Sequence, residues 1–150
     1  MAASVLAATR AALIAVIDAA LVADGDFPKT QTRFSWRSDW ATKEKVFTHG
    51  GRMDHDPAAL RAGATVRNES GEFDVLIEVM LPGRDATAAI DRAFEIDRVV
   101  GEQIALHKND LAVPGLLWIR SQGVVLDAEG EVDQGSGARV VHTVHFEARL

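Results

Sequence analysis

The chain has 150 residues, the size of one domain with a well-developed hydrophobic core. Its net charge of −6 argues against a general nucleic-acid-binding surface, which would be basic. The absence of cysteine excludes disulfides, cysteine nucleophiles and thiolate metal sites.

An apolar segment at residues 3–23 predicts the first helix. No basic region precedes it, and Arg10 and Asp18 interrupt it, which argues against a signal peptide and against a membrane-spanning helix. Its large apolar side chains recur at helical spacing and predict a stripe that faces the core. Gly25 is placed to end this helix in the left-handed conformation.

The next segments change from helical to strand-like spacing. TRFSW at residues 32–36 alternates and predicts a half-exposed strand with Trp36 in the core. KVFTH at residues 45–49 predicts a second short strand. Residues 49–71 are rich in glycine and charge and predict a long loop or arm, which is usually functional or mobile in a compact domain.

The clearest strand is EFDVLIEVML at residues 72–81, and its apolar face consists of Phe73, Val75, Ile77, Val79 and Leu81. Asp85 is placed to cap the second long helix at residues 85–110. Asp97 falls in the middle of the apolar stripe of that helix, which consists of Ile90, Ala93, Phe94, Val100, Gly101 and Ile104. Two interpretations remain open: an edge acid paired with an arginine, or a buried or interface acid with another partner. The first is favoured, because acids are almost never fully buried unless paired.

Two further segments, residues 116–127 and 139–150, predict an antiparallel hairpin joined by an acidic, glycine-rich loop at residues 128–137. The order of elements predicts a single α+β domain over residues 1–150. We expect a mostly antiparallel sheet of four or five strands with the two long helices packed on one face.

The HTVHFEARL segment at residues 142–150 contains a histidine pair that could suggest a metal site. Strand alternation places His142 and His145 on opposite faces, so they are not expected to share an ion. His142 must then find a partner on the apolar face of its strand. The MDHDP segment at residues 53–57 has no recognised metal-binding spacing. We therefore expect no metal and no cofactor.

Signatures of catalysis are also missing. No serine lies between glycines at a sharp strand-to-helix turn. The glycine-rich loop lacks the lysine and the following helix that a phosphate-binding loop requires. The many acidic residues offer carboxylate pairs, but the sequence selects none of them. These observations predict a protein that is not an enzyme.

Residues on the predicted outer faces are candidates for contacts with other subunits or partners. The candidate interface residues are Trp40, Asp97, Trp118, His145, Glu147 and Arg149. A second group consists of four clustered acids, Asp127, Glu129, Glu131 and Asp133. A solvated charged loop is one explanation of this second group.

Taken together, these segments resemble the tail terminator (tail completion) proteins of long-tailed bacteriophages, of the minor tail protein U type. The resemblance covers nearly the whole chain and rests on length and element order. The segments that carry the resemblance are, in chain order, the apolar first helix, TRFSW, the strand FDVLIEVML, PGRDA before DRAFEIDRVVGEQIA, LAVPGLLWI and VVHTVHFEARL. No single motif among these is diagnostic, and neither Asp97 nor residues 49–71 match a fixed feature of the family.

The resemblance implies a homo-oligomeric ring, usually a hexamer, at the head–tail junction of a virion assembled in the host cytoplasm. Such a ring caps the tail tube, ends its polymerisation and joins the head connector. Its partners are other copies of the chain, the tail-tube protein and the connector. DNA passes through without specific binding, no membrane is involved, and the family has no catalytic residues. In such a ring the second group of acids is a candidate for the lumen or rim, and a solvated loop explains that group equally well. Two alternatives remain: a head-completion or connector-adaptor protein of the phage neck, and a small cytoplasmic α+β enzyme or ligand-binding domain.

Overall fold

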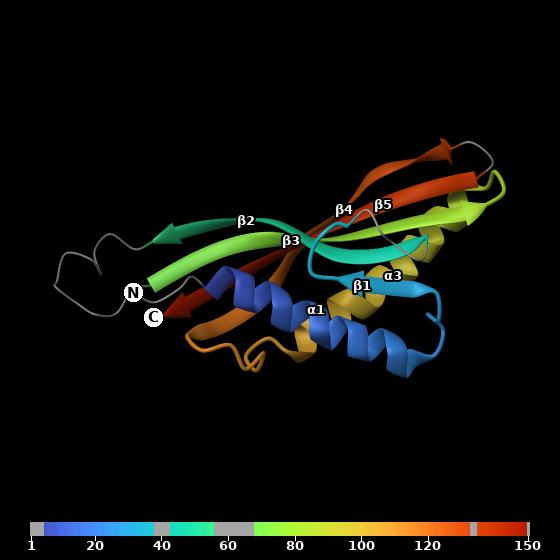
Figure 1. The fold of residues 1–150 in the computed structure, drawn as a ribbon. Helices are drawn as coiled ribbons and strands as arrows, with labels where there is room; N and C mark the ends of the chain where they lie inside the picture. Colours follow the sequence, from blue (N-terminus) through green and yellow to red (C-terminus); the bar gives the residue numbers. More distant parts are fainter. Residues whose placement is uncertain (1–4, 38–42, 56–67, 133–134, 150) are drawn as a thin grey trace.

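The computed structural model describes residues 5–37, 43–55, 68–132 and 135–149. The elements are α1 (Val5–Asp24), β1 (Thr30–Arg33), β2 (Glu44–His55), β3 (Asn68–Pro82), α3 (Ala86–Leu106), β4 (Leu116–Val132) and β5 (Gly135–Arg149). Five strands form one sheet in the order β1-β2-β3-β5-β4 (Figure 1). The α+β class is confirmed, and the sheet is mixed because β1 runs parallel to β2.

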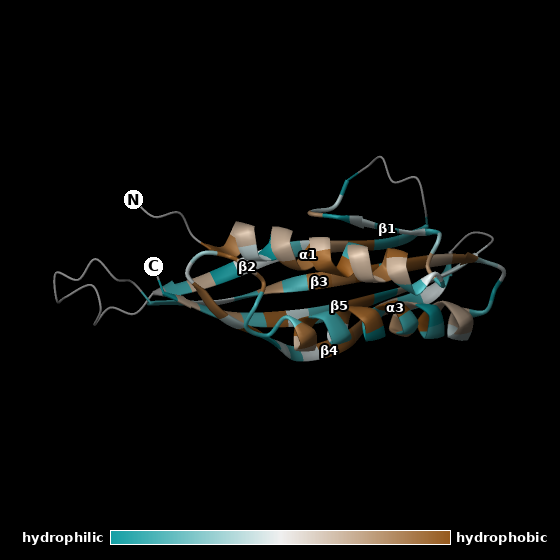
Figure 2. Ribbon diagram, turned by 90° about the horizontal axis from the view of Figure 1, so that it is seen from below, coloured by the Kyte–Doolittle hydropathy of each residue, from teal (hydrophilic) through white to brown (hydrophobic). Residues whose placement is uncertain are grey.

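The hydrophobic core lies between the sheet and the helices. Alternate residues of β3 are buried, as the sequence predicts, and they include Phe73, Val75, Ile77 and Val79. The antiparallel neighbour β5 contributes Val140, Val144 and Phe146 to the same core. Helix α3 contacts β3, β4 and β5, whereas α1 contacts β1, β2 and α3. Figure 2 shows the two helices side by side.

Helix α1 ends where the sequence predicts, since Gly25 adopts a φ of 81°. By length and composition alone, this helix is apolar enough to cross a membrane. In the folded chain, Leu13, Ile17 and Leu21 are buried in the core. The core helix of a globular domain passes the same length and composition test.

Helix α3 begins with the predicted cap, because Oδ1 of Asp85 accepts a hydrogen bond from the backbone N–H of Ala88 at 3.2 Å. One residue of the predicted stripe lies elsewhere: Phe94 is 40% exposed. Ile96 and Val99 are buried in its place. The buried face of α3 is therefore rotated slightly from the expected one.

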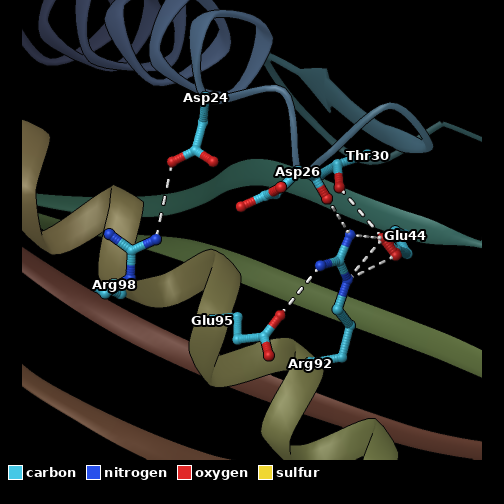
Figure 3. A network of polar contacts seen from close by, with 7 residues as sticks. All are labelled: Asp24, Asp26, Thr30, Glu44, Arg92, Glu95 and Arg98. Carbon is cyan, nitrogen blue, oxygen red and sulfur yellow. Dashed lines mark hydrogen bonds and ion pairs between the residues drawn. The ribbon is translucent and has the colours of Figure 1, made fainter.

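A network of charged side chains joins the two helices and the first strands (Figure 3). Arg92 on α3 pairs with the buried carboxylate of Glu44 on β2 at 2.9 Å. It also donates to the backbone carbonyl of Asp26 at 3.0 Å. The hydrogen bond to Glu44 raises the pKa of Arg92. A second, more exposed contact of 3.8 Å joins Arg98 on α3 to Asp24 at the end of α1.

Three segments depart from the predicted secondary structure. The first strand is Thr30–Arg33 rather than residues 32–36, and Trp36 is 57% exposed rather than part of the core. The predicted arm at residues 49–71 is partly strand, because β2 extends to His55 and β3 begins at Asn68. The remainder of the predicted arm, residues 56–67, lies outside the described residues.

The third departure is the predicted loop at residues 128–137, which mostly belongs to the long hairpin of β4 and β5. Strand β4 is an edge of the sheet, and its pairing with β5 shifts register at three places. The shifts lie between Leu116 and Trp118, between Ser121 and Gly123, and between Leu126 and Ala128. Another irregularity interrupts β2, between His49 and Arg52.

Candidate functional site

An apolar row crosses the face of the sheet opposite the core, here called the outer face. Register places Phe47 of β2 opposite Leu76 of β3, Leu76 opposite Val141 of β5, and Val141 opposite Val125 of β4. Directly opposed residues of an antiparallel pair share one face of a sheet. Val125 is 61% exposed, and Leu76 and Val141 are half-buried. We call these four residues the outer row.

Polar pairs lie on both sides of the outer row. On one side Arg139 contacts Glu78 at 2.7 Å and Asp127 at 3.6 Å. On the other side the hydroxyl of Thr143 donates to Asp74 at 2.9 Å. An apolar centre with a polar rim is the typical anatomy of a protein–protein interface.

An aromatic cluster extends the outer face at one end of the hairpin. The rings of Trp118 and His145 lie 5.4 Å apart, and the guanidinium of Arg120 lies 4.9 Å from the Trp118 ring. Glu147 is opposite Trp118 in the register, and Arg149 donates to the Asn68 side chain at 3.3 Å. Four of the predicted interface residues, Trp118, His145, Glu147 and Arg149, are thus neighbours on adjacent strands. Trp40 lies outside the described residues.

The predicted acidic group is not a loop cluster. Asp127, Glu129 and Glu131 belong to strand β4, and Asp133 lies outside the described residues. The register shift before Ala128 allows Asp127 to contact Arg139, whereas Glu129 is paired with Ala138, which belongs to the core. Asp127 and Glu129 therefore lie on different faces of the hairpin.

A second polar group joins α3, β5 and β4 on the core side of the sheet. Oδ1 of Asp97 lies 2.7 Å from Nδ1 of His142, and Nε2 of His142 lies 2.6 Å from the hydroxyl of Ser121. Asp97 is only 8% exposed and His142 only 3%, whereas Ser121 is exposed. We call these three residues the Ser–His–Asp relay.

The relay corrects two expectations about Asp97. Its partner is a histidine rather than an arginine, and it is buried inside the subunit rather than available to a neighbouring one. Two signals for this pair were present in the sequence: an acid within an apolar helical stripe, and a histidine on the apolar face of a strand. The sequence around Ser121 gave no comparable signal, because this serine does not lie between glycines at a strand-to-helix turn.

The two histidines of the last strand lie on opposite faces, as strand alternation predicts. His142 contacts Asp97 on the core side, and His145 contacts Trp118 on the outer side. Within the described part of the chain, no group of three histidine, aspartate or glutamate side chains is arranged to hold a metal ion.

No protein-family model matches the chain, and no curated protein sequence is significantly similar to it. The class of the protein therefore rests on its own architecture, which in the described residues is an α+β arrangement of two helices and a five-stranded mixed sheet.

Proposed function

We propose that the chain is a structural protein of a long-tailed phage: the tail terminator, which assembles into a ring at the head–tail junction. The ring, a hexamer by resemblance to the family, caps the tail tube and ends its polymerisation. It then offers its other side to the head connector. The observation that carries this proposal is the outer row, an apolar strip with a polar rim on the outer face of the sheet.

The arrangement of helices supports the proposal. Helix α3 contacts β3, β4 and β5, and α1 contacts β1, β2 and α3. In the outer row Phe47 is already buried, whereas Val125 is 61% exposed and is left for a contact between subunits. The exposed part of the outer row would be buried when a neighbouring subunit packs against it. Burial of apolar surface is the main favourable contribution to most protein association.

A ring also requires a second, different surface on each subunit, because a head-to-tail contact joins two unlike patches. Helix α3 offers one on the opposite side of the molecule. Its Phe94 is 40% exposed and its Leu106 is 70% exposed. An outer row that packs against α3 of the next subunit would give a heterologous contact, which closes into a ring when the rotation permits.

DNA passes through such a ring during packaging and injection, so tight binding would be a disadvantage. The net charge of −6 supports weak contact with the phosphate backbone. Glu129 and Glu131, which are exposed at the far end of β4, contribute to this charge.

A matched pair of substitutions tests the assembly surface. Val125→Lys places a charge in the outer row, whereas Val124→Lys places the same charge on the adjacent residue, which is paired with His142 of the core side. We expect the wild-type chain and V124K to form rings in native mass spectrometry and electron microscopy, and V125K to remain monomeric. A chain that is monomeric at high concentration, or a V125K variant that still forms rings, would contradict the proposal.

The partner is tested separately. A terminator added to polymerising tail-tube protein should bind the tube end and stop its elongation. A connector-adaptor protein of the neck would instead bind portal rings and leave tube length unchanged. Measuring tube length by electron microscopy with wild type and V125K distinguishes these two roles.

A further inference from the structure

We propose that Ser121 is an activated nucleophile, and that the Ser–His–Asp relay forms a site of acyl transfer for small carboxylic esters. This inference does not depend on the proposed role in the tail. It rests on a row of two short contacts between three side chains from three elements. Ser121 on β4 contacts His142 on β5, and His142 contacts Asp97 on α3.

The first step of the argument concerns the tautomer of His142. The ionised carboxylate of Asp97 can only accept a hydrogen bond, so Nδ1 of His142 must carry the proton across their 2.7 Å contact. In the neutral imidazole Nε2 is then an acceptor. The hydroxyl of Ser121 donates to it at 2.6 Å. A base held in one tautomer beside a hydroxyl is the arrangement that activates a serine.

The second step concerns burial. Asp97 and His142 are almost completely enclosed, so water competes little for their hydrogen bonds. The backbone of α3 packs closely beside the imidazole, because a side chain at Gly101 would place its Cβ 3.7 Å from Cε1 of His142. These contacts hold the ring in place and position Nε2 toward Ser121.

The third step concerns access to the hydroxyl. Ser121 is exposed, and a Cβ added to the nearby Gly123 would have no atom within 4 Å, so the space beside this stretch of β4 is open. The register passes from Ser121 to Gly123, which makes Gln122 the extra residue of a bulge. The peptide group of such a residue is left outside the ladder.

The reaction follows from these roles. Oγ of Ser121 attacks the ester carbonyl, and its proton passes to Nε2 of His142. The bond between the carbonyl carbon and the alcohol oxygen breaks, and the alkoxide takes the proton from Nε2. Water then hydrolyses the acyl-serine by the same two proton transfers in reverse. Asp97 is a positioning residue, since it acts through the imidazole.

The test measures the rate at which a fluorophosphonate probe modifies individual serines of the full chain, located by peptide mass spectrometry. Attack of Oγ on phosphorus expels fluoride, and the proton passes to His142. We expect Ser121 to react at least about 100-fold faster than the exposed Ser35, because a positioned base contributes roughly that much. The same chain should release nitrophenol from p-nitrophenyl acetate, and Ser121→Ala should abolish that release.

Substitutions of the base complete the test. His142→Gln should slow modification of Ser121 about 100-fold while modification of Ser35 is unchanged. Asp97→Asn should slow it as well, because an amide fixes the tautomer less well. Equal rates at Ser121 and Ser35 in the wild-type chain would overturn the proposal, and that comparison holds even if a variant fails to fold. An unchanged Ser121 rate in folded H142Q would overturn it too.

Discussion

The Nε atom of Arg92 lies 3.1 Å from both carboxylate oxygens of Glu44, although 48 positions separate the two residues in the chain. This contact joins the helix α3 to the strand β2 beside the end of α1 (Figure 3). Glu44 is only 7% exposed, so its charge depends on partners within the protein rather than on water.

Arg92→Met should therefore destabilise the fold. It removes the guanidinium and leaves a buried carboxylate with fewer partners, at a cost of about 2 kcal/mol in the free energy of unfolding. Urea denaturation followed by circular dichroism measures the change. Arg98→Met is the matched control on the same helix, because Arg98 is 54% exposed and its ion pairs are solvated. A loss in R98M as large as in R92M would contradict this account.

The pair of Asp97 and His142 leads to a second stability prediction. Asp97→Ala leaves Nδ1–H of a buried imidazole without its acceptor and should cost about 2 kcal/mol. Asp97→Asn keeps an oxygen at the same place and should cost less. Substitution of Glu102, an exposed acid five residues further along α3, by alanine should have little effect. Thermal unfolding of the three variants tests this order, and equal losses in D97A and D97N would count against it.

Gly71 provides a packing prediction. A Cβ at this position would overlap the carbonyl oxygen of Arg52 and lie 2.7 Å from Cζ of Phe146. Gly71→Ala should therefore displace two central elements of the sheet and lower stability by about 2 kcal/mol. Gly123→Ala is the control, because its Cβ would meet no atom within 4 Å. Near-neutral results for both variants, measured by denaturant unfolding, would refute the predicted clash.

Gly101 should tolerate what Gly71 does not. It lies within α3, where its added Cβ would contact the His142 ring at an ordinary 3.7 Å. Because glycine is unfavourable inside a helix, Gly101→Ala should raise the free energy of unfolding by about 0.5–1 kcal/mol. Differential scanning calorimetry provides the measurement. A lower melting temperature in G101A would mean that the imidazole needs more room than the structure allows.

Patterns among neighbouring residues correctly predicted the buried face of β3 and the ends of the helices. The alternation of Phe73, Val75 and Ile77 predicted the buried face of β3, and the positions of Asp85 and Gly25 predicted helix ends. Residues 49–55 were predicted as loop because glycine and charge are typical of loops. They form a strand because β3 supplies partners for His49 and for residues 52–55, which the sequence of β2 alone does not reveal.

Less of the Ser–His–Asp relay could be predicted from the sequence. Burial of Asp97 and of His142 was each suggested by the apolar pattern around it, yet their pairing depends on how α3 docks against β5. Ser121 joins them because β4 pairs it with Val144, which lies on the same face of β5 as His142. Trp36 was placed in the core by alternation, but β1 ends at Arg33 and the alternation stops there. Contacts between distant segments decided the pairing of Asp97 with His142 and the position of Ser121.

The two edges of the sheet bear on how the free subunit behaves at high concentration. An unprotected edge strand is a template for ordered aggregation, in which chains add strand to strand without limit. Here one edge, β1, has only four residues, and the other, β4, changes register three times. A second chain aligned along β4 would therefore lose its pairing after a few residues. Copies of the chain can accumulate while strand-by-strand fibre growth is disfavoured.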